Sequence, residues 1–478
     1  MNEVRTRYAP SPTGYMHIGN LRTALYEYLI AKKFKGKFIL RIEDTDQERL
    51  VEDSLEVIYK TLELVGIKYD EGPYFQSERL DIYKPYAEQL VEKGEAYYCF
   101  CTKDRLDTLR KKQEEAGEFA HYDYNCRNLA KEEIDEKLKH NQQYVIRQKM
   151  PLAGETTFDD VVYGNIKVDN SELEDQILLK TDGFPTYNFA NVVDDHLMNI
   201  THVVRGSEYL SSTPKYNLLY NSFGWEIPTY VHLPLILNEE GHKLSKRLGD
   251  KSFEDLLEEG YLVEAVINFI ALLGWSPGDE REFFTLKELE ENFTIEGISK
   301  SPSVFDKTKL KWMNAEYIRK MDLIKFAELI KNQIIGEIGN ELDYIKIAKL
   351  LQKRVELLTE VESYLGVFKS VAEYSSELYI HKKMKTDQEI ALSSLQLAIK
   401  RLTELDENQY TEEILHDTLI SLAAEQGLKN GQLLWPLRVA LTGTEQSPGG
   451  AIELIEIFGK SKSINRINEA IGKLMKGE

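Results

Sequence analysis

The sequence predicts an α/β protein followed by a region made almost only of helices. In the first part, short apolar runs alternate with segments whose apolar residues recur at helical spacing, which is typical of a parallel sheet covered by helices. After about residue 250 the helical spacing continues and short strand-like runs become rare. The length of 478 residues is too great for one hydrophobic core, so we expect several domains.

The first 70 residues follow the order strand, helix, strand, helix. Residues 4–8 are a short β-like run and residues 38–42 are short and apolar, and both are expected to form strands. Residues 18–29 and 50–65 carry leucine, isoleucine and valine at the spacing of one helical face. This order predicts parallel strands that are joined by crossover helices.

Between about residues 80 and 185 the alternation is interrupted by a charged region, which we interpret as an insertion. A helix over 79–94 opens this region, and short strands over 143–149 and 176–180 follow. All three cysteines of the chain lie within it. An odd, low cysteine number argues against a framework of disulfides.

The α/β alternation then resumes. We expect strands over 200–205 and 230–237 on either side of a helix over 214–223. The later part of the chain is expected to be helical, and its long amphipathic stretches include residues 348–367. Shorter helices are expected at 252–260, 263–273 and 285–292.

Composition limits the classes of partner. No stretch approaches the roughly 20 apolar residues of a membrane span, and the N-terminal residues lack the apolar core of a signal peptide, so we expect a cytoplasmic protein without a membrane partner. The net charge of −20 argues against nucleic acid binding over the whole surface. The 60 lysines and arginines still suffice for a local basic face.

A turn rich in glycine and proline, PSPTGYMHIGN at residues 10–20, separates the first predicted strand from the first predicted helix. Ligands of α/β proteins bind at this position, beyond the carboxyl ends of the strands. Gly14 and Gly19 let the backbone approach a bound group closely, and the helix N-terminus favours phosphate. His17 can donate a hydrogen bond to a phosphate oxygen.

A second motif, KLSKR at residues 243–247, follows the predicted strand VHLPLIL and the turn NEEGH. Two lysines and an arginine on one loop suit closure over a triphosphate, because nucleotidyl transfer develops negative charge that cations stabilise. Taken alone, such a loop could equally be a solvated basic segment.

Together, the two motifs resemble the signatures of the glutamyl and glutaminyl branch of class I aminoacyl-tRNA synthetases. Asn20 stands where the class signature has its second histidine, which resembles the bacterial glutamate enzymes. The resemblance extends from Arg7 to about Gly449. It implies a Rossmann-like catalytic domain with an inserted α+β domain, followed by an all-helical anticodon-binding region. The helical C-terminal half distinguishes the chain from glutaminyl enzymes, which carry β-barrels there.

The resemblance implies five parts. They are the first half of the catalytic domain at 1–80, an acceptor-binding insertion at 81–187, the second catalytic half at 188–250, a helical stem-contact region at 251–322 and an anticodon-binding domain at 323–478.

The activity that the resemblance implies is ATP-dependent activation of L-glutamate, followed by its transfer to the 3′ end of tRNA(Glu). ATP and Mg²⁺ would be required. By similarity, Lys246 contacts ATP and stabilises the adenylation transition state with help from Lys243 and His17, and Glu208 contacts the ATP ribose. Gly19 and Asn20 complete the predicted ATP site.

An acidic amino acid needs a cation for its side chain and an acidic or polar group for its ammonium, and arginine is the better partner for a carboxylate. By similarity, Arg205 and Arg7 bind the side-chain carboxylate, and Glu43 binds the ammonium. Ser11, Tyr187 and Asn191 are the remaining predicted substrate contacts.

The cysteine spacing suggests a zinc site formed by Cys99, Cys101 and Cys126. Some bacterial relatives supply a fourth ligand as Cys-x-His, but Asn128 occupies the histidine position here. Tyr122 could replace it, and His121 is a weaker candidate. The alternative interpretation is three reduced structural thiols.

Several functional alternatives stay open at this point. The chain could be another class I aminoacyl transferase, a non-catalytic tRNA-binding paralogue, or a nucleotidyltransferase without a nucleic acid partner. The motifs do not decide whether tRNA(Gln) is also charged. Arg354 is a candidate anticodon-reading residue. We expect a monomer.

Overall fold

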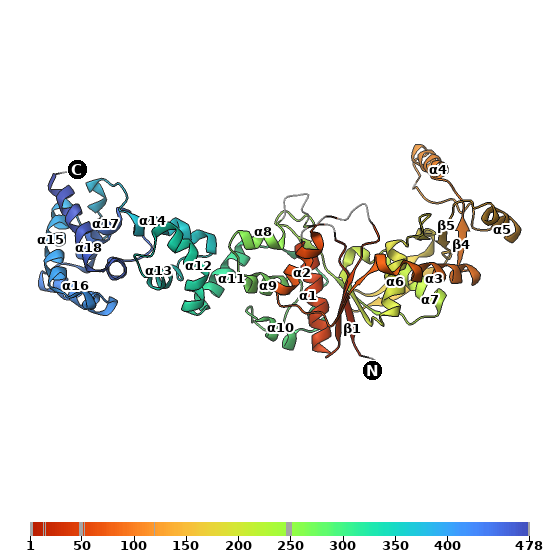
Figure 1. Ribbon diagram of the computed structural model, residues 1–478, viewed down its shortest axis with the longest axis horizontal. Coiled ribbons are helices and arrows are strands. Elements are labelled where there is room, and N and C mark those ends of the chain that lie inside the picture. Colours follow the sequence, from red (N-terminus) through yellow and green to blue (C-terminus); the bar gives the residue numbers. More distant parts are fainter. Residues whose placement is uncertain are drawn as a thin grey trace. The chain divides into compact units, whose positions relative to one another are not determined.

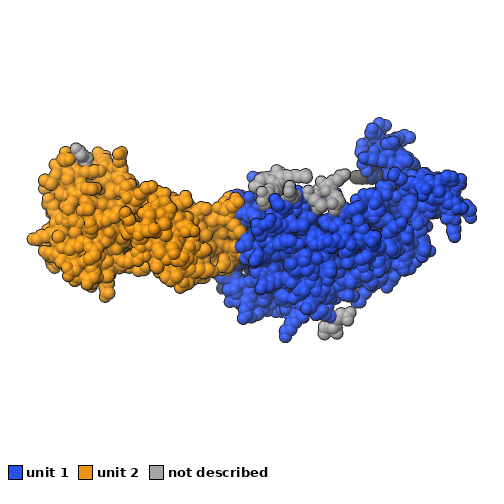
Figure 2. All heavy atoms as spheres, in the orientation of Figure 1, with its two compact units in different colours: residues 1–256, 266–307 blue, residues 257–265, 308–478 orange. Residues whose placement is uncertain are grey.

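The computed structural model describes residues 3–12, 14, 16–46, 51, 53–118, 120–244 and 251–476. It divides into two compact units, coloured separately in Figure 2. Unit 1 comprises Met1–Leu256 and Val266–Lys307, and unit 2 comprises Leu257–Ala265 and Thr308–Glu478. Figure 1 labels the elements in chain order.

The first half of unit 1 is a parallel βαβαβ arrangement, as the sequence predicts. Strands β1 (Arg5–Tyr8), β2 (Lys37–Ile42) and β3 (Glu71–Phe75) pair in that order, and helices α1 (Ile18–Lys33) and α2 (Ser54–Leu64) connect them. In β2 only the first residue is not fully buried, so both of its faces are covered. The turn after β1 therefore lies at the carboxyl edge of a buried sheet.

The second half of unit 1 continues beside β1. Helix α6 (Tyr187–Leu197) leads into strand β9 (His202–Gly206), which is parallel to β10 (Thr229–Leu233). The connection between these two strands contains η4 (Ser207–Tyr209) and α7 (Thr213–Phe223). The backbone N–H of Thr201 donates to the carbonyl oxygen of Arg5 at 3.0 Å. Strands β1 and β9 are therefore neighbours, although they come from distant parts of the sequence.

The interrupting region contains a small antiparallel sheet of order β4-β5-β8. Its elements are η2 (Gln76–Arg79), α3 (Leu80–Glu92), β4 (Ala96–Cys99), α4 (Lys103–Glu115), α5 (Lys131–Lys139), β5 (Val145–Gln148) and β8 (Ile177–Leu179). The hairpin β6 (Glu155–Asp160) and β7 (Gly164–Asp169), followed by η3 (Asn170–Glu172), joins a different sheet, of order β7-β6-β10-β9. Part of this region thus belongs to the same sheet as β9 and β10.

The single strand expected over 230–237 is wrong. Strand β10 ends at Leu233, and the next strand, β11 (Ile236–Leu237), pairs with β12 (Ser303–Val304) instead of β9. Pro234 stands at the break, where it has no backbone N–H to offer a ladder. The remaining elements before unit 2 are α8 (Phe253–Glu258), α9 (Val263–Leu272), α10 (Leu286–Asn292) and η6 (Ile295–Gly297).

Unit 2 is helical and packs around one apolar core, which is formed mainly by leucine, alanine and isoleucine side chains. Its elements are α11 (Lys307–Lys320), α12 (Leu323–Ile338), α13 (Tyr344–Leu351), η7 (Leu358–Glu360), α14 (Val361–Lys369), η8 (Ser376–Tyr379), α15 (Gln388–Glu404), η9 (Glu407–Gln409), α16 (Glu412–Glu425), α17 (Asn430–Thr442) and α18 (Ala451–Lys476). Among the described residues, none of the helices has the length and apolar character needed to cross a membrane.

The continuous helix expected over 348–367 is also wrong, because the chain leaves the helical conformation between α13 and α14. In this break, side chains replace helical hydrogen bonds. Asn314 donates to the carbonyl oxygen of Glu356 at 2.6 Å, and the carboxylate of Glu360 accepts from the backbone N–H of Glu356 at 2.8 Å. Val355 lies in this break and is fully buried, so its apolar side chain fits the helical spacing of the sequence although the backbone there is not helical.

Arg466, on the last helix, closes the ends of two others. Its Nη1 donates to the carbonyl oxygens of Val367, at 2.8 Å, and Leu441, at 2.5 Å, near the C-termini of α14 and α17. Its Nη2 donates to the carbonyl oxygen of Phe368 at 3.4 Å. Helix C-termini carry partial negative charge and carbonyls without helical partners, so a buried cation is well suited there.

Candidate active site

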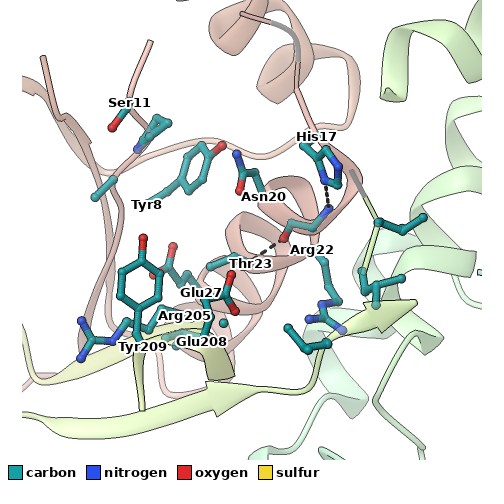
Figure 3. Close-up of a pocket in the computed structure, with 18 of the residues that line it drawn as sticks. Tyr8, Ser11, His17, Asn20, Arg22, Thr23, Glu27, Arg205, Glu208 and Tyr209 are labelled. Carbon is teal, nitrogen blue, oxygen red and sulfur yellow. Dashed lines mark hydrogen bonds between the residues drawn. The ribbon is translucent and has the colours of Figure 1, made fainter. Parts of the chain in front are cut away.

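A cavity of about 490 Å³ opens in unit 1 where β1 and β9 end and α1 begins (Figure 3). Most of the predicted site residues line it: Arg7, Ser11, His17, Gly19, Asn20, Glu43, Tyr187, Arg205, Glu208 and Lys243. Asn191 is buried on α6 and does not line the cavity; its Nδ2 has no hydrogen-bond partner among the described residues. Lys246 lies outside the described residues.

The glycine-rich turn brings a helix N-terminus to this cavity. Gly14 has a φ of 123°, a conformation that other residues rarely adopt. His17 caps α1, and its Nδ1 accepts the backbone N–H of Gly19 at 3.2 Å (Figure 3). A neutral His17 that accepts at Nδ1 carries its proton on Nε2, an N–H of the kind that can donate to a phosphate oxygen. Together with the N–H groups of the first turn, this favours a bound phosphate.

A chain of buried charges reaches the cavity through Arg7, Glu27 and Glu43, which line it. Arg7 donates from Nε to Asp195 at 2.9 Å and from Nη1 to Glu27 at 3.0 Å. Arg41 donates to the same oxygen of Asp195 at 2.7 Å and to Glu43 at 3.1 Å. The chain thus contains two guanidinium groups and three carboxyl groups, so one carboxyl group is in excess.

The carboxyl groups of this chain differ in how easily they ionise, and the two that line the cavity, Glu27 and Glu43, would gain from a neighbouring cation. Arg7 and Arg41 outweigh the effect of burial and lower the pKa of Asp195, which is held ionised. Burial instead raises the pKa of Glu43, and raises that of Glu27 well above its usual range. The Oε2 atom of Glu27 has no hydrogen-bond partner among the described residues. This part of the cavity therefore suits a cationic group of a ligand.

Arg205 is buried in a different environment. Its Nη2 donates to the hydroxyl oxygen of Thr213 at 2.9 Å, and its Nε donates to Nε2 of His232 at 3.3 Å. The guanidinium carbon lies 4.4 to 5.5 Å from the ring centres of Tyr209, Tyr216 and Tyr230. Within the part of the chain that the structure describes, no carboxylate pairs with Arg205. A buried cation in this state favours an anionic ligand.

Glu208 and Lys243 form an ion pair at the mouth of the cavity, with 2.8 Å between Nζ and Oε1. The Glu208 carboxylate folds over Gly206, where a Cβ would lie only 2.0 Å from Oε2. Position 206 therefore requires glycine if Glu208 is to take this conformation. Both side chains of the pair are about half exposed, at 55% for Lys243 and 42% for Glu208, so a ligand can reach them.

The three cysteines meet at the end of β4, away from this cavity. Their Sγ atoms all lie within 4.8 Å of one another. The hydroxyl of Tyr122 is 3.3 Å from Sγ of Cys99 and 3.6 Å from Sγ of Cys101. His121 instead contacts the side chain of Gln113. Of the two candidate fourth ligands, Tyr122 is the one that reaches the thiols.

The family model described as "tRNA synthetases class I (E and Q), catalytic domain" matches residues 3–312. The chain belongs to this family. A second family model, "Anticodon binding domain", matches residues 325–471 of this class I synthetase. The resemblance inferred from the two motifs and the predicted fold class are both confirmed.

This synthetase is similar to curated relatives along its whole length. It is 56% identical over 482 residues to a glutamate–tRNA ligase of Clostridium kluyveri, with 99% of each chain covered. It is 57% identical over 481 residues to one of Clostridium botulinum strain Loch Maree, again covering 99% of each chain. A crystal structure of a glutamate tRNA ligase from Elizabethkingia meningosepticum in complex with its amino acid superposes with a TM-score of 0.90, at 37% identity, covering 99% of this chain and 100% of that one.

Sequence reasoning missed several residues of the synthetase site. Tyr8, Arg22, Thr23, Glu27 and Tyr209 also line the cavity. Glu27 did carry a signal, because it is a lone carboxylate inside the apolar helical run LYEYLI. Nothing in the sequence around Thr23 or Tyr209 distinguishes them from ordinary surface or core residues.

Proposed function

We propose that this synthetase is a glutamate–tRNA ligase, which activates L-glutamate with ATP and transfers it to the 3′ end of tRNA(Glu). The observation that carries the proposal is the charge pattern of the cavity. Arg205 is a buried cation without a carboxylate partner among the described residues, and the charge chain that also reaches the cavity has one more carboxyl group than guanidinium groups. An amino acid with an acidic side chain complements both features. The names of the curated relatives agree with this proposal.

In the proposed complex, Arg205 binds the side-chain carboxylate of glutamate, and Arg7 adds positive charge nearby. Glu43 receives the ammonium, since it lies at the end of the charge chain with the excess carboxyl group. Ser11 and Tyr187, which line the cavity, make the remaining contacts, whereas the predicted contact by Asn191 is not part of this proposal because Asn191 does not line the cavity. Because Asp195 and Glu27 already neutralise Arg7, Arg205 contributes more to recognition of the carboxylate.

In the first step, a carboxylate oxygen of the α-carboxyl group attacks the α-phosphorus of ATP, and pyrophosphate leaves. The resulting glutamyl-adenylate is a mixed anhydride. His17, Gly19 and Asn20 bind phosphate oxygens at the start of α1, and Glu208 binds the ribose. Lys243 and Lys246 stabilise the negative charge that develops on the phosphates. Mg²⁺ bound by ATP supplies further positive charge there.

In the second step, a hydroxyl of the terminal adenosine of tRNA attacks the activated carbonyl carbon, and AMP leaves. No protein nucleophile takes part, so catalysis depends on positioning and on charge stabilisation. In this proposal the tRNA contacts residues 81–187 with its acceptor end, residues 251–322 with its stem and residues 323–478 with its anticodon. Residues 1–80 and 188–250 form the catalytic domain.

Arg354 remains the proposed anticodon reader. It is exposed on unit 2 and lines a hollow of about 90 Å³ that also contains three lysines and three glutamates. Lys349 pairs with Glu412 and Lys346 with Glu456, so Arg354 and Lys353 are the cations of this hollow outside those two pairs. Exposed cations beside a hollow are suited to a flipped base and its phosphate. We further propose that the synthetase is a cytoplasmic monomer.

The test is charging of radiolabelled glutamate onto separate transcripts of tRNA(Glu) and tRNA(Gln), with ATP and Mg²⁺. Charging of tRNA(Glu) is the expected result. Additional charging of tRNA(Gln) would make the enzyme non-discriminating. If glutamate reaches neither transcript, and glutamine is not charged either, the synthetase reaction is excluded and a tRNA-binding role takes its place.

For the cysteine cluster we propose one structural Zn²⁺, held by Cys99, Cys101, Cys126 and Tyr122. Three thiols and one phenol lie close enough to supply the four donor atoms of a tetrahedral zinc site, with the phenol in place of the usual histidine or fourth thiol. Nη1 of Arg105 lies 3.5 Å from Sγ of Cys101, so a positively charged group stands beside the cluster. The ion would tie β4 to the turn that carries Cys126.

This zinc proposal is tested by the metal content of the purified protein and by cobalt substitution. We expect about one zinc per chain and an absorption band from thiolate ligands to cobalt, both lost in C126S. Y122F should keep the thiolate band and shift the visible d–d bands. A protein that purifies without metal and binds no cobalt would establish three reduced thiols instead.

A further inference from the structure

Behind Arg205 lies a buried pair whose members come from two different strands. Asp160, the last residue of β6, accepts from Nδ1 of His232 at 2.7 Å and from its backbone N–H at 3.0 Å. His232 is on β10, and its side chain is completely buried. The other oxygen of Asp160 accepts the backbone N–H groups of Val162 at 2.9 Å and Tyr163 at 2.7 Å. Both carboxylate oxygens are therefore satisfied and fixed.

This arrangement sets the tautomer of His232. Because Nδ1 carries the proton that Asp160 accepts, Nε2 of the neutral ring has only a lone pair. Nε2 faces the Nε–H of Arg205 at 3.3 Å, so it acts as the acceptor. A charged or flipped ring would direct an N–H at the N–H of Arg205, which is repulsive. Desolvation by burial lowers the pKa of His232, in agreement with a neutral ring.

The contacts of Arg205 determine which edge of its guanidinium remains. Nε is used by His232, and one hydrogen of Nη2 is used by Thr213. The Thr213 hydroxyl donates to the carbonyl oxygen of Tyr209 at 2.9 Å, and its oxygen also lies 3.2 Å from Nε2 of His232, so Thr213 belongs to the same network. The outer edge, formed by Nη1 and the second hydrogen of Nη2, is left for a bidentate carboxylate.

We propose that Asp160 and His232 are positioning residues that fix Arg205 in the orientation that receives the side-chain carboxylate of glutamate. This rests on the proposed function of Arg205. The long arginine side chain otherwise populates many rotamers, and ordering it would cost affinity for each substrate molecule bound. Asp160 lies within residues 81–187, so the interrupting region contributes to amino-acid recognition as well as to the sheet.

Two substitutions of His232 separate positioning from packing. In H232Q the amide oxygen can take the place of Nε2 and accept from Arg205. In H232N the shorter amide can replace only Nδ1, so the contact with Arg205 is lost. We expect H232N to raise the KM for glutamate roughly fivefold to twentyfold in tRNA charging, with kcat and the KM for ATP within about twofold. H232Q should stay near the parent, as should the control H202N on the neighbouring strand.

D160N provides a second route that leaves the ring in place. Without the carboxylate, His232 can adopt the other tautomer, so D160N should resemble H232N in its KM for glutamate. Lysine lacks the Nε donor, and in an R205K background H232N should therefore have no additional effect. Melting temperatures of all variants report on folding.

The outcomes distinguish the positioning role of Asp160 and His232 from the role of Arg205 in binding glutamate. If H232N and D160N leave the KM for glutamate unchanged, or if H232Q changes it as much as H232N, positioning is rejected. Equal changes in the KM for ATP would also reject it, because they indicate general damage. If R205K itself leaves the KM for glutamate unchanged, the role of Arg205 in the proposed function fails first. A further rise of KM in R205K/H232N would show that His232 acts by another route.

Discussion

Arg7 and Arg205 show how surroundings give two identical side chains different electrostatic roles. Both are buried and line the same cavity. Arg7 shares Asp195 with Arg41 and also pairs with Glu27, so its charge is compensated within the protein. Arg205 is surrounded by tyrosine rings, a hydroxyl and a neutral imidazole. A ligand carboxylate gains more from an uncompensated cation than from a compensated one.

Replacement of Glu43 by glutamine should weaken the binding of glutamate. In E43Q the neutral amide cannot form an ion pair with the ammonium of glutamate, so the KM for glutamate should rise about 10- to 100-fold. The KM for ATP should change less than threefold. Pyrophosphate exchange in the presence of tRNA measures both. The exposed E226Q is the matched control, and an equal rise in the KM for ATP would contradict the assignment.

The second prediction concerns pH. Burial holds the pKa of Glu43 above its usual value, so this carboxyl group becomes protonated at a higher pH than an exposed glutamate would. Since the ionised form is needed for the ammonium, kcat/KM for glutamate should fall as pH decreases through that raised pKa. E43Q should lack this part of the decline. Ionisation of the substrate itself persists in both enzymes and provides the reference.

Arg466 on α18 connects the ends of two other helices. Burial lowers the pKa of its guanidinium to about 10, and its donors go to backbone carbonyls near the ends of α14 and α17. One side chain thus satisfies groups on two helices that belong to different parts of the sequence. The chain of α18 is itself interrupted at Gly459, where φ is 67°.

R466M should therefore lower the free energy of unfolding by about 1–3 kcal/mol, because it leaves buried carbonyls without donors. Denaturant titration followed by circular dichroism measures the change. R401M removes an exposed ion pair with Glu425 and should stay within about 0.5 kcal/mol of the parent. Equal losses in the two variants would show that Arg466 is not a helix cap.

The elements also show what the sequence could and could not predict. The turn from Pro10 to Asn20 is contiguous, so its glycines, histidine and following helix could be interpreted together. The Asp160–His232 pair behind Arg205 could not be predicted, because these two residues are 72 positions apart and meet only through the pairing of β6 and β10. The strand that ends at Leu233 could have been anticipated from Pro234 alone.

For the whole molecule, the path of the chain matters as much as its two units. Residues 257–265 belong to unit 2, although unit 1 resumes after them. Leu262 and Ala265 are part of the apolar core of unit 2, and the backbone N–H of Leu262 donates to Asn314 at 2.8 Å. No single cut in the chain therefore separates the two units.

A fragment that ends after Lys307 should consequently expose Leu262 and Ala265 and lose their partners in unit 2. We expect a lower melting temperature than the corresponding transition of the full chain, and binding of a hydrophobic dye. A fragment that ends after Lys320 retains α11 with Asn314 and should be less affected. Identical melting of the shorter fragment and the full chain would contradict this division.

In the proposed ATP site, a ligand that binds either Glu208 or Lys243 breaks their ion pair, so a nucleotide has to replace both partners. A ligand that binds only the lysine leaves the carboxylate of Glu208 without its partner. A ligand that binds only the carboxylate leaves the ammonium of Lys243 without its partner. Tripolyphosphate alone and adenosine alone each disrupt the pair without compensating both halves. ATP satisfies both ends at once. Because the pair is half exposed, the penalty on such partial ligands is about 1 kcal/mol or less, enough to favour the complete nucleotide over its fragments in a mixed pool.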